Sequence, residues 1–178
     1  MGFSRAKKTI SDESALYEYA VGALGRRMRS VAELKRLLRQ RVEPGTAGES
    51  LVEAVVARLK EQKYLNDAQY ASAYSSYRRD NEKFGRLRVI SDLKSRGVHG
   101  EVIEKAIAGA YAEVNDEQQA RAFLRRKRLQ KPTSQKQAAR IYRTLARAGF
   151  GSKVIVSILK KWDVDDEVLT ALESEAVT

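Results

Sequence analysis

Arginine and lysine are the residues of this chain whose spacing points to a chemical role, and that role is anion binding. Residues 118–162 contain 13 Lys and Arg residues and no Asp or Glu. Solvated surfaces ordinarily mix the two signs of charge, so an unbroken run of cations favours a polyanionic partner. Residues 163–178 carry six acids and no base. The net charge of +11 is therefore a property of one segment, and an acidic segment follows it directly.

Helical spacing arranges these cations in two bands. One band steps by four, three and four residues, which at 100° per residue keeps it on one face of a helix, and it consists of Lys136, Arg140, Arg143 and Arg147. The other lies in the preceding predicted helix and consists of Arg121, Arg125 and Arg128, to which the neighbouring Arg126 and Lys127 add charge. The alternative, an ordinary solvated face of an amphipathic helix, leaves the missing acids unexplained. We expect both bands to contact phosphates or acidic patches of a partner.

Side chains suited to catalysis or metal binding are scarce. The chain has no cysteine, which excludes disulfides and thiolate metal sites. Its single histidine, His99, is more simply a turn residue, and the Asp165–Asp166 pair is more simply a solvated charge run than a magnesium site. Phosphate-loop, nucleophile-elbow and zinc-protease motifs are absent from the sequence. The sequence therefore predicts no enzyme, no cofactor and no metal.

The sequence also predicts a cytoplasmic protein without a membrane partner. No apolar run approaches the roughly 20 residues that span a bilayer, and the first ten residues lack the apolar core of a secretory signal.

Three copies of one helical unit position the cations. In each copy an apolar residue is followed after two residues by a second and after four more by a third. The three sets are Leu34, Leu37 and Val42, then Ile90, Leu93 and Val98, then Tyr142, Leu145 and Phe150. Repetition at this period is typical of stacked helical units. We predict an all-α fold, an elongated tandem array of three three-helix repeats.

The expected boundaries follow from the caps and loops. A basic arm with Arg5, Lys7 and Lys8 precedes the repeats, and an acidic tail follows them. The tail has three open interpretations: a passive end, a segment that competes with the polyanion, or a capping helix through Val164, Val168, Leu169 and Leu172. The segments are residues 1–10 (arm), 11–65, 66–114 and 115–162 (repeats one to three) and 163–178 (tail).

Local signals mark several helix ends. Capping boxes are predicted at Ser30–Glu33 and at Ser134–Gln137, and Ser152 is predicted to cap the helix after Gly149. Asn66 and Asn115, each followed by aspartate, begin the second and third repeats. Gly97 is predicted to end a helix. The tyrosine stripe of Tyr70, Tyr74 and Tyr77 could stack on exposed bases, but core packing is the favoured interpretation.

Taken together, the order and spacing of these motifs resemble the RecX family, regulators of the bacterial RecA recombinase. The resemblance spans about residues 15–162. It is carried by Ala23-Leu24-x-x-Arg27-x-Arg29-Ser30-x-x-Glu33-Leu34, by Leu59-x5-Leu65-Asn66-Asp67-x-x-Tyr70-Ala71, by Phe84-Gly85-x-x-Arg88-Val89-Ile90-x-x-Leu93-x3-Gly97-Val98, and by Gly149-Phe150 with Ile155. Departures from the family pattern are the loop at residues 44–48, Asn66 where an acidic residue is usual, and the acidic tail.

The resemblance implies a regulator that binds the RecA–single-stranded DNA filament along its groove, and we expect the protein to be a monomer. Such a protein restrains RecA ATPase and strand exchange, and hence DNA repair, recombination and the SOS response. It also implies single-stranded DNA as a direct partner, with duplex DNA as a second candidate. Arg27 and Arg29, which belong to the first motif, join the expected contact residues.

A second hypothesis does not involve RecA. A helical DNA- or RNA-binding protein that inserts one helix into a groove carries the same charge pattern. Sedimentation with RecA filaments and with naked nucleic acid in the same salt separates the two hypotheses.

The tandem arrangement predicts the size of the protein in solution. A compact chain of 178 residues has a radius of gyration of about 16 Å. We expect small-angle X-ray scattering to give a clearly larger radius, together with an almost purely helical circular dichroism spectrum. A radius near the compact value, or appreciable strand content, contradicts the predicted array.

Overall fold

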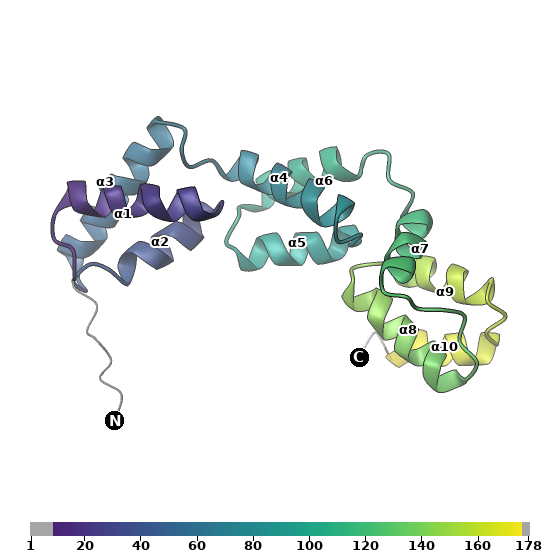
Figure 1. Cartoon of the computed structure of the whole chain (residues 1–178). Helices are drawn as coiled ribbons and strands as arrows, with labels where there is room; N and C mark the ends of the chain where they lie inside the picture. The colour runs from purple at the N-terminus through teal and green to yellow at the C-terminus, as the bar shows by residue number, and fades with distance from the viewer. Residues whose placement is uncertain (1–8, 176–178) are drawn as a thin grey trace, which may run out of the picture. The chain divides into compact units, whose positions relative to one another are not determined.

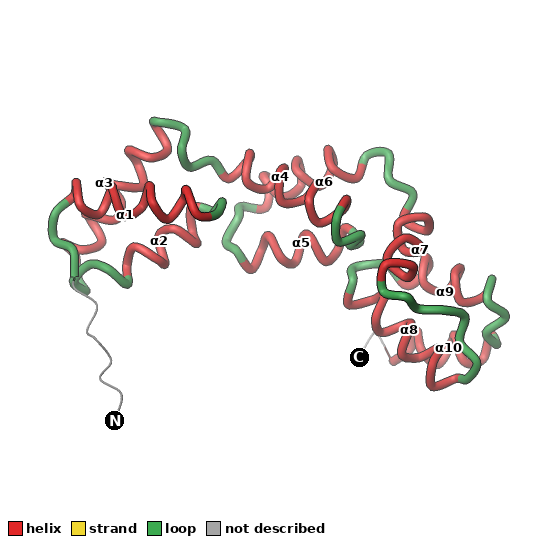
Figure 2. Tube along the Cα trace, in the orientation of Figure 1, coloured by secondary structure: helices red, strands yellow, loops and turns green. Residues whose placement is uncertain are grey.

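The computed structural model describes residues 9–175, which form ten helices and no strand (Figures 1 and 2). The all-α prediction is therefore confirmed. Arg5, Lys7 and Lys8 of the predicted basic arm lie outside the described residues. The helices follow one another in groups of three, with one further helix at the end. They are α1 Glu13–Arg26, α2 Val31–Arg39, α3 Thr46–Glu61, α4 Asp67–Asp80, α5 Arg86–Ser95, α6 Gly100–Tyr111, α7 Asp116–Arg126, α8 Gln135–Arg147, α9 Ser152–Lys160 and α10 Asp166–Glu175.

The chain divides into two compact units. The first contains the residues up to Ala71 together with Lys94–Val102, and the second contains Ser72–Leu93 together with the residues from Ile103 onward. The first unit thus holds the whole of repeat one, and the second holds the whole of repeat three. Each takes part of the middle repeat, so the units do not coincide with the repeats.

Side-chain caps fix where most of the predicted helices begin. The side chains of Asn66 and Asn115 each accept a hydrogen bond of 3.0 Å from the backbone three residues on, as predicted. Ser30 and Glu33 form the full capping box. At the start of α8 only half of the predicted box forms. Ser134 caps the helix, but the Gln137 amide accepts from the backbone and hydroxyl of Thr133 instead of reaching the cap residue.

The predicted cap at Ser152 is wrong. Helix α9 has Gly151 as its N-cap, without a side-chain hydrogen bond, and Ser152 is already its first helical residue. Backbone N–H groups at the start of a helix can be satisfied by water or by ligands as well as by side chains, so sequence preference alone misplaced this boundary by one residue.

The first and third repeats each have a buried apolar core. That of repeat one joins α1, α2 and α3 through residues such as Leu16, Leu34 and Leu59. That of repeat three joins α7, α8 and α9 through Phe123, Leu145 and others. The recurring apolar spacing holds in full in repeat three. In the first two repeats the helix register differs by one residue: the fully buried positions are Leu34 with Leu38 and Val89 with Leu93, whereas Leu37 and Ile90 are half-buried.

The acidic tail contains the helix α10, which packs along α8 and α9 (Figure 1). Leu169 and Leu172 are buried in the core of repeat three, with Val164 and Val168 against it. Of the three interpretations of the tail, the capping helix is confirmed, and the passive end is wrong for residues 163–175. Burial of the two leucines explains why α10 packs against repeat three, because each buried leucine side chain stabilises the folded state by about 1.5–3 kcal/mol relative to an exposed one.

Within the second unit, the end of α8 meets the start of α5 through a close backbone approach. The N–H of Gly85 donates to the carbonyl of Ala148 at 2.9 Å, and that of Leu87 donates to the carbonyl of Gly149 at 3.3 Å. A Cβ atom on Gly85 would lie 2.3 Å from the Gly149 carbonyl oxygen. Glycine is therefore required here for lack of space. The rings of Phe84, Phe123 and Phe150 pack beside the contact, with centroids 5.8 and 6.0 Å apart.

Within the first unit, a buried carboxylate ties the start of α2 to residues near the end of α5. The side chain of Glu33 is 12% exposed and pairs with Arg96 at 2.6 Å. The hydroxyl of Ser30 donates to the carbonyl of Arg96 at 2.6 Å, and Asp67 accepts from the N–H of Val31 at 2.8 Å. The family-like residues Ser30, Glu33 and Asp67 therefore act as structural contacts of the helix ends.

Of the tyrosine stripe, Tyr70 is buried and Tyr74 is half-buried, as core packing requires. Tyr77 is 56% exposed, so the prediction that the whole stripe packs in the core is wrong. Burial raises the pKa of Tyr70 to about 12, and its hydroxyl lies 3.3 Å from Glu33, to which it donates. Tyr70 is therefore a protonated structural donor at neutral pH.

The backbone approach at Gly149 predicts a large loss of stability on substitution. Gly149 has φ +89°, and a Cβ there would lie 2.2 Å from the backbone nitrogen of Arg88. We expect Gly149→Ala to lower the free energy of unfolding by about 2–4 kcal/mol, because it combines left-handed strain with a clash against backbone. Urea unfolding of the full chain measures the change.

The matched control is Gly109→Ala, in the exposed interior of α6, where an added Cβ meets nothing within 4 Å. That variant should gain up to about 1 kcal/mol from helix propensity. Equal unfolding midpoints for the two variants contradict the argument.

Candidate polyanion-binding site

The exposed face of α8 carries a row of cations without counter-charges. Lys136, Arg140, Arg143 and Arg147 are all exposed, and none forms an ion pair with a described carboxylate. At a rise of about 1.5 Å per residue, neighbouring members stand roughly 4.5–6 Å apart along the helix axis. The buried residues Ala138, Ile141, Tyr142 and Leu145 anchor the opposite face of α8 in the core.

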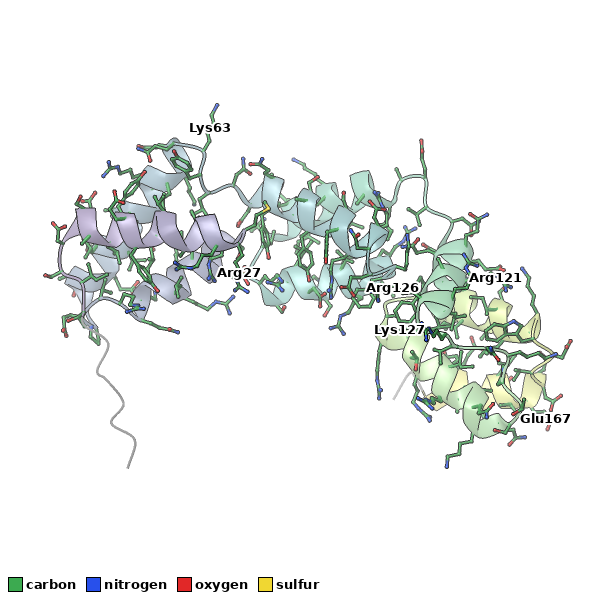
Figure 3. All side chains as sticks on the ribbon, viewed as in Figure 1. Arg27, Lys63, Arg121, Arg126, Lys127 and Glu167 are labelled. Atoms are coloured by element: carbon green, nitrogen blue, oxygen red, sulfur yellow. The ribbon has the colours of Figure 1, made fainter. Side chains whose placement is uncertain are left out.

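The cations that end α7 add to this charge, but not all of them equally. Arg125, Lys127 and Arg128 are exposed and have no described acidic partner. Arg126 approaches Glu82 at 3.8 Å, so part of its charge is already compensated. Figure 3 shows Arg126 and Lys127 at the same end of α7, well away from Glu167 of α10.

Arg121 lies in an ion-pair network rather than on an open surface. Its guanidinium and the Lys161 ammonium bind the same carboxylate, that of Glu117, at 3.0 and 2.8 Å. Hydrogen bonds from Lys161 and Arg121 hold the pKa of Glu117 below its ordinary value. The network joins α7 to the end of α9, which makes Arg121 the member of the band most engaged in structure.

Arg27 and Arg29 belong to the first unit, whereas the other nine predicted contact residues belong to the second. Arg27 is well exposed and approaches Glu33 at 3.9 Å. Arg29 is half-buried, and its Nε atom is buried without a hydrogen-bond partner among the described residues. Of the two, Arg27 is therefore the more exposed.

Sequence reasoning passed over Lys131, which extends the surface of the α7–α8 connection. Lys131 is exposed and pairs with Asp163 at 2.6 Å. Its presence in the same acid-free run was the available signal. It was passed over because a connection has no helical periodicity.

The acidic residues of the tail form their ion pairs with cations that do not belong to the α8 row. Asp163 pairs with Lys131, and Asp166 pairs with Lys160 at 2.9 Å. Burial raises the pKa of the Tyr142 phenol, and the charge of the nearby Glu173 raises it further. Competition between the tail and a polyanion for the α8 row therefore has no ion pair to support it among the described residues.

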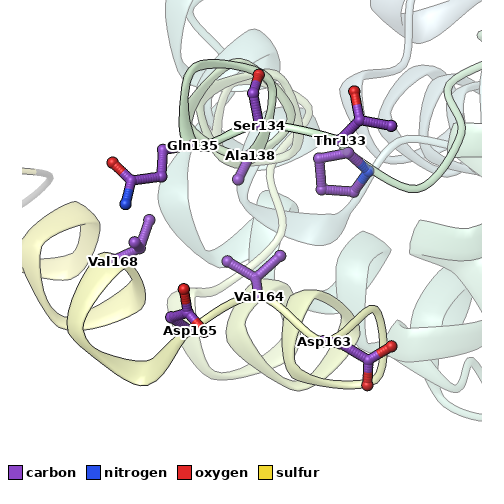
Figure 4. Close-up of a pocket in the computed structure, with 9 residues that line it drawn as sticks. Thr133, Ser134, Gln135, Ala138, Asp163, Val164, Asp165 and Val168 are labelled. Atoms are coloured by element: carbon purple, nitrogen blue, oxygen red, sulfur yellow. The ribbon is translucent and has the colours of Figure 1, made fainter.

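The acids and the histidine considered in the sequence do not gather into a metal-ligand cluster in the described part of the chain. Residues 9–175 contain no group of three or more metal-ligating side chains. A cavity of about 290 Å³ lies between the start of α8 and the α9–α10 connection, and Asp163, Asp165, Val164, Val168 and Ala138 are among the residues that line it (Figure 4). In Figure 4 the Asp163 carboxylate points away from the α8 side chains. His99 is exposed beside the start of α6.

Among the described helices, none is both long and apolar enough to cross a membrane.

Known proteins similar to this chain agree on one family. Residues 66–107 match the description "RecX, second three-helix domain". Regulatory protein RecX of Deinococcus radiodurans is 35% identical over 151 residues, covering 85% of this chain and 70% of the relative. That of Pseudomonas putida KT2440 is 32% identical over 153 residues, covering 85% of this chain and 94% of the relative. The chain belongs to the RecX family.

Solved structures of RecX proteins share its fold. RecX from Lactobacillus salivarius superposes with a TM-score of 0.62 at 19% identity, covering 85% of this chain and 96% of the other. A second RecX structure, of a regulatory protein, gives 0.62 at 21% identity, covering 84% and 71%. The three-helix repeat is thus the shared architecture. The residues that carry the family resemblance here, such as Glu33 and Gly149, are structural, whereas the α8 cations lie outside them.

Pairing within the fold predicts unequal roles for two arginines of this RecX chain. Arg143→Ala removes an unpaired cation. The slope of log K against log salt concentration, measured for binding to a single-stranded oligonucleotide, should therefore fall in magnitude by about 0.7, the value for one phosphate contact. Arg121→Ala removes a cation that already pairs with Glu117, so the salt dependence should stay near that of the unaltered chain. Anisotropy titrations over a range of salt concentrations measure both slopes, and a larger drop for Arg121→Ala contradicts the assignment.

Proposed function

We propose that this chain is a non-enzymatic regulator that binds the RecA–single-stranded DNA filament and inhibits RecA. The activities restrained are ATP hydrolysis, strand exchange, and the recombination and SOS functions that depend on the filament. Membership of the RecX family supports the choice of partner. The observation that carries the proposal is the α8 row, four exposed cations without acidic partners among the described residues.

The charge of this face suits a filament better than a compact acidic protein. A filament offers phosphates and acidic patches at regular intervals, and a straight row of cations on one helix can meet several of them together. Arg140, Arg143 and Arg147 supply point charges or bidentate donors, which are the usual partners of phosphate and carboxylate. The third repeat therefore contributes most of the electrostatic attraction.

Inhibition in this proposal is a consequence of binding alone. Without catalytic turnover, one regulator acts only on the filament segment that it occupies. Cytoplasmic location, a monomeric state and the lack of a cofactor belong to the same proposal.

The alternative is a helical protein that acts on DNA or RNA without RecA, and the same cation row supports it. Sedimentation of the full chain with RecA filaments, naked single strands and duplex DNA in one salt decides between them. The proposal expects preferential sedimentation with the filament. Equal sedimentation with naked nucleic acid, and none that depends on RecA, favours the alternative.

Stoichiometric binding predicts how inhibition depends on concentration. Suppression of RecA ATPase should saturate at a fixed ratio of this chain to filament, and Arg140→Ala/Arg143→Ala/Arg147→Ala should shift half-inhibition to at least tenfold higher concentration, since three cation contacts are lost. The control Arg26→Ala/Arg36→Ala/Lys60→Ala removes the same charge from exposed positions of the first unit. Progressive inactivation of excess RecA by trace amounts contradicts a mechanism without turnover.

A further inference from the structure

The α7–α8 connection and the first half of α8 enclose an open cleft of about 360 Å³. Its apolar part is formed by Ile141, which is buried, and by Leu129, which is half-buried. Arg128, Lys131 and Arg140 line it as well. This volume is at the lower end of the range of small-ligand sites, roughly 300–1,000 Å³.

The fold holds this cleft open. Arg128 has a left-handed φ of 54°, and its N–H donates to the carbonyl of Arg125 at 3.0 Å. The N–H of Leu129 donates to the carbonyl of Leu124 at 2.9 Å, which closes the end of α7. On the other wall, the Gln137 oxygen accepts from the backbone N–H and the hydroxyl of Thr133, at 2.9 and 3.0 Å. The N–H groups of the Gln137 side-chain amide have no partner among the described residues, whereas its backbone N–H donates to the Ser134 hydroxyl at 3.3 Å.

The charge of the cleft is one-sided. No acid lines it, and Arg128 and Arg140 have no ion pair with a described carboxylate. Lys131 shares its charge with Asp163. An anionic group is therefore favoured at the rim, and a flat apolar group on the floor. Phosphate alone would make no favourable contact with the apolar side chains of Leu129 and Ile141.

We propose that this cleft holds one nucleotide of a single-stranded nucleic acid. The base lies on Leu129 and Ile141, where the guanidinium planes can also stack, and the neighbouring phosphates meet Arg128 and Arg140. A single strand is favoured over a duplex because its bases are free to leave the stack. Nucleic acid is favoured over an acidic peptide because the cleft opens onto the straight α8 row, which matches a linear polyanion.

The inference deepens the proposed function and rests on it for the biological source of the strand. It assigns Arg140, the member of the α8 row that lines the cleft, to a direct contact with DNA rather than with protein. Binding of isolated oligonucleotides tests it without RecA.

The test uses Gln137→Glu in the full chain. A glutamate still accepts from Thr133, but it replaces the free N–H donors with a carboxylate inside the cleft. The control is Gln135→Glu, which makes the same charge change in the same first turn of α8, at an exposed position outside this cleft. The probes are a fluorescent oligothymidylate, the same strand with abasic sugars, and a duplex of equal length.

We expect Gln137→Glu to weaken oligothymidylate binding at least fivefold more than Gln135→Glu does. The unaltered chain should bind the abasic strand at least fivefold more weakly than oligothymidylate, the lower end of the effect of one stacked base. Equal effects of the two substitutions overturn the inference. Equal affinity for the abasic strand, or for the duplex, overturns it too.

Two further outcomes separate this inference from the proposed function. If the chain inhibits RecA, and Gln137→Glu weakens that inhibition without affecting oligothymidylate binding, the cleft takes an acidic protein segment and the nucleotide assignment is wrong. If the oligonucleotide results hold but no sedimentation with RecA filaments occurs, the nucleotide site stands and the RecA proposal fails.

Discussion

The approach of two backbones at Gly85 and Gly149 is the constraint on which the rest of the second unit depends. Helix α8 ends in a left-handed turn at this contact, where the carbonyls of Ala148 and Gly149 accept hydrogen bonds from the N–H groups of Gly85 and Leu87. These hydrogen bonds fix the end of α8 against the start of α5, and the position of the cation row on α8 follows from that contact. A side chain at either position forces the backbones apart, because the obstructing atoms are main-chain atoms that cannot rotate away.

The cations of the α8 row remain unpaired among the described residues because the nearby acidic residues form ion pairs with other cations of the second unit. Glu117 joins α7 to α9 by binding Arg121 and Lys161, and Asp163 and Asp166 of the tail pair with Lys131 and Lys160. Helix α10 thus stabilises repeat three by burying leucines without neutralising the α8 face. Unpaired, exposed cations add little to folding stability, so their concentration on one helix is better explained by a partner than by the fold.

Apart from Arg27 and Arg29, the residues that carry the family resemblance are distinct from those of the candidate site. Ser30, Glu33 and Asp67 satisfy helix ends and join elements of the first unit, while Gly85 and Gly149 permit a close approach in the second. Such residues report the architecture of a RecX protein. The candidate surface is defined instead by the placement of cations on α8 that have no acidic partner among the described residues.

The sequence by itself determined what depends on neighbours a few residues apart: the helical class, the caps at Asn66, Asn115, Ser30 and Ser134, and the steps of three and four residues that gather the α8 cations. Only the tertiary structure decided the pairing of Arg121, the burial of α10, the exposure of Tyr77 and the cleft beside Ile141. Lys161 lies 44 residues from Glu117, and Arg126 likewise finds Glu82 across a distance in sequence that no helical period covers. Periodicity gives the face of a helix on which a side chain lies, whereas its partner depends on which other helices pack against that face.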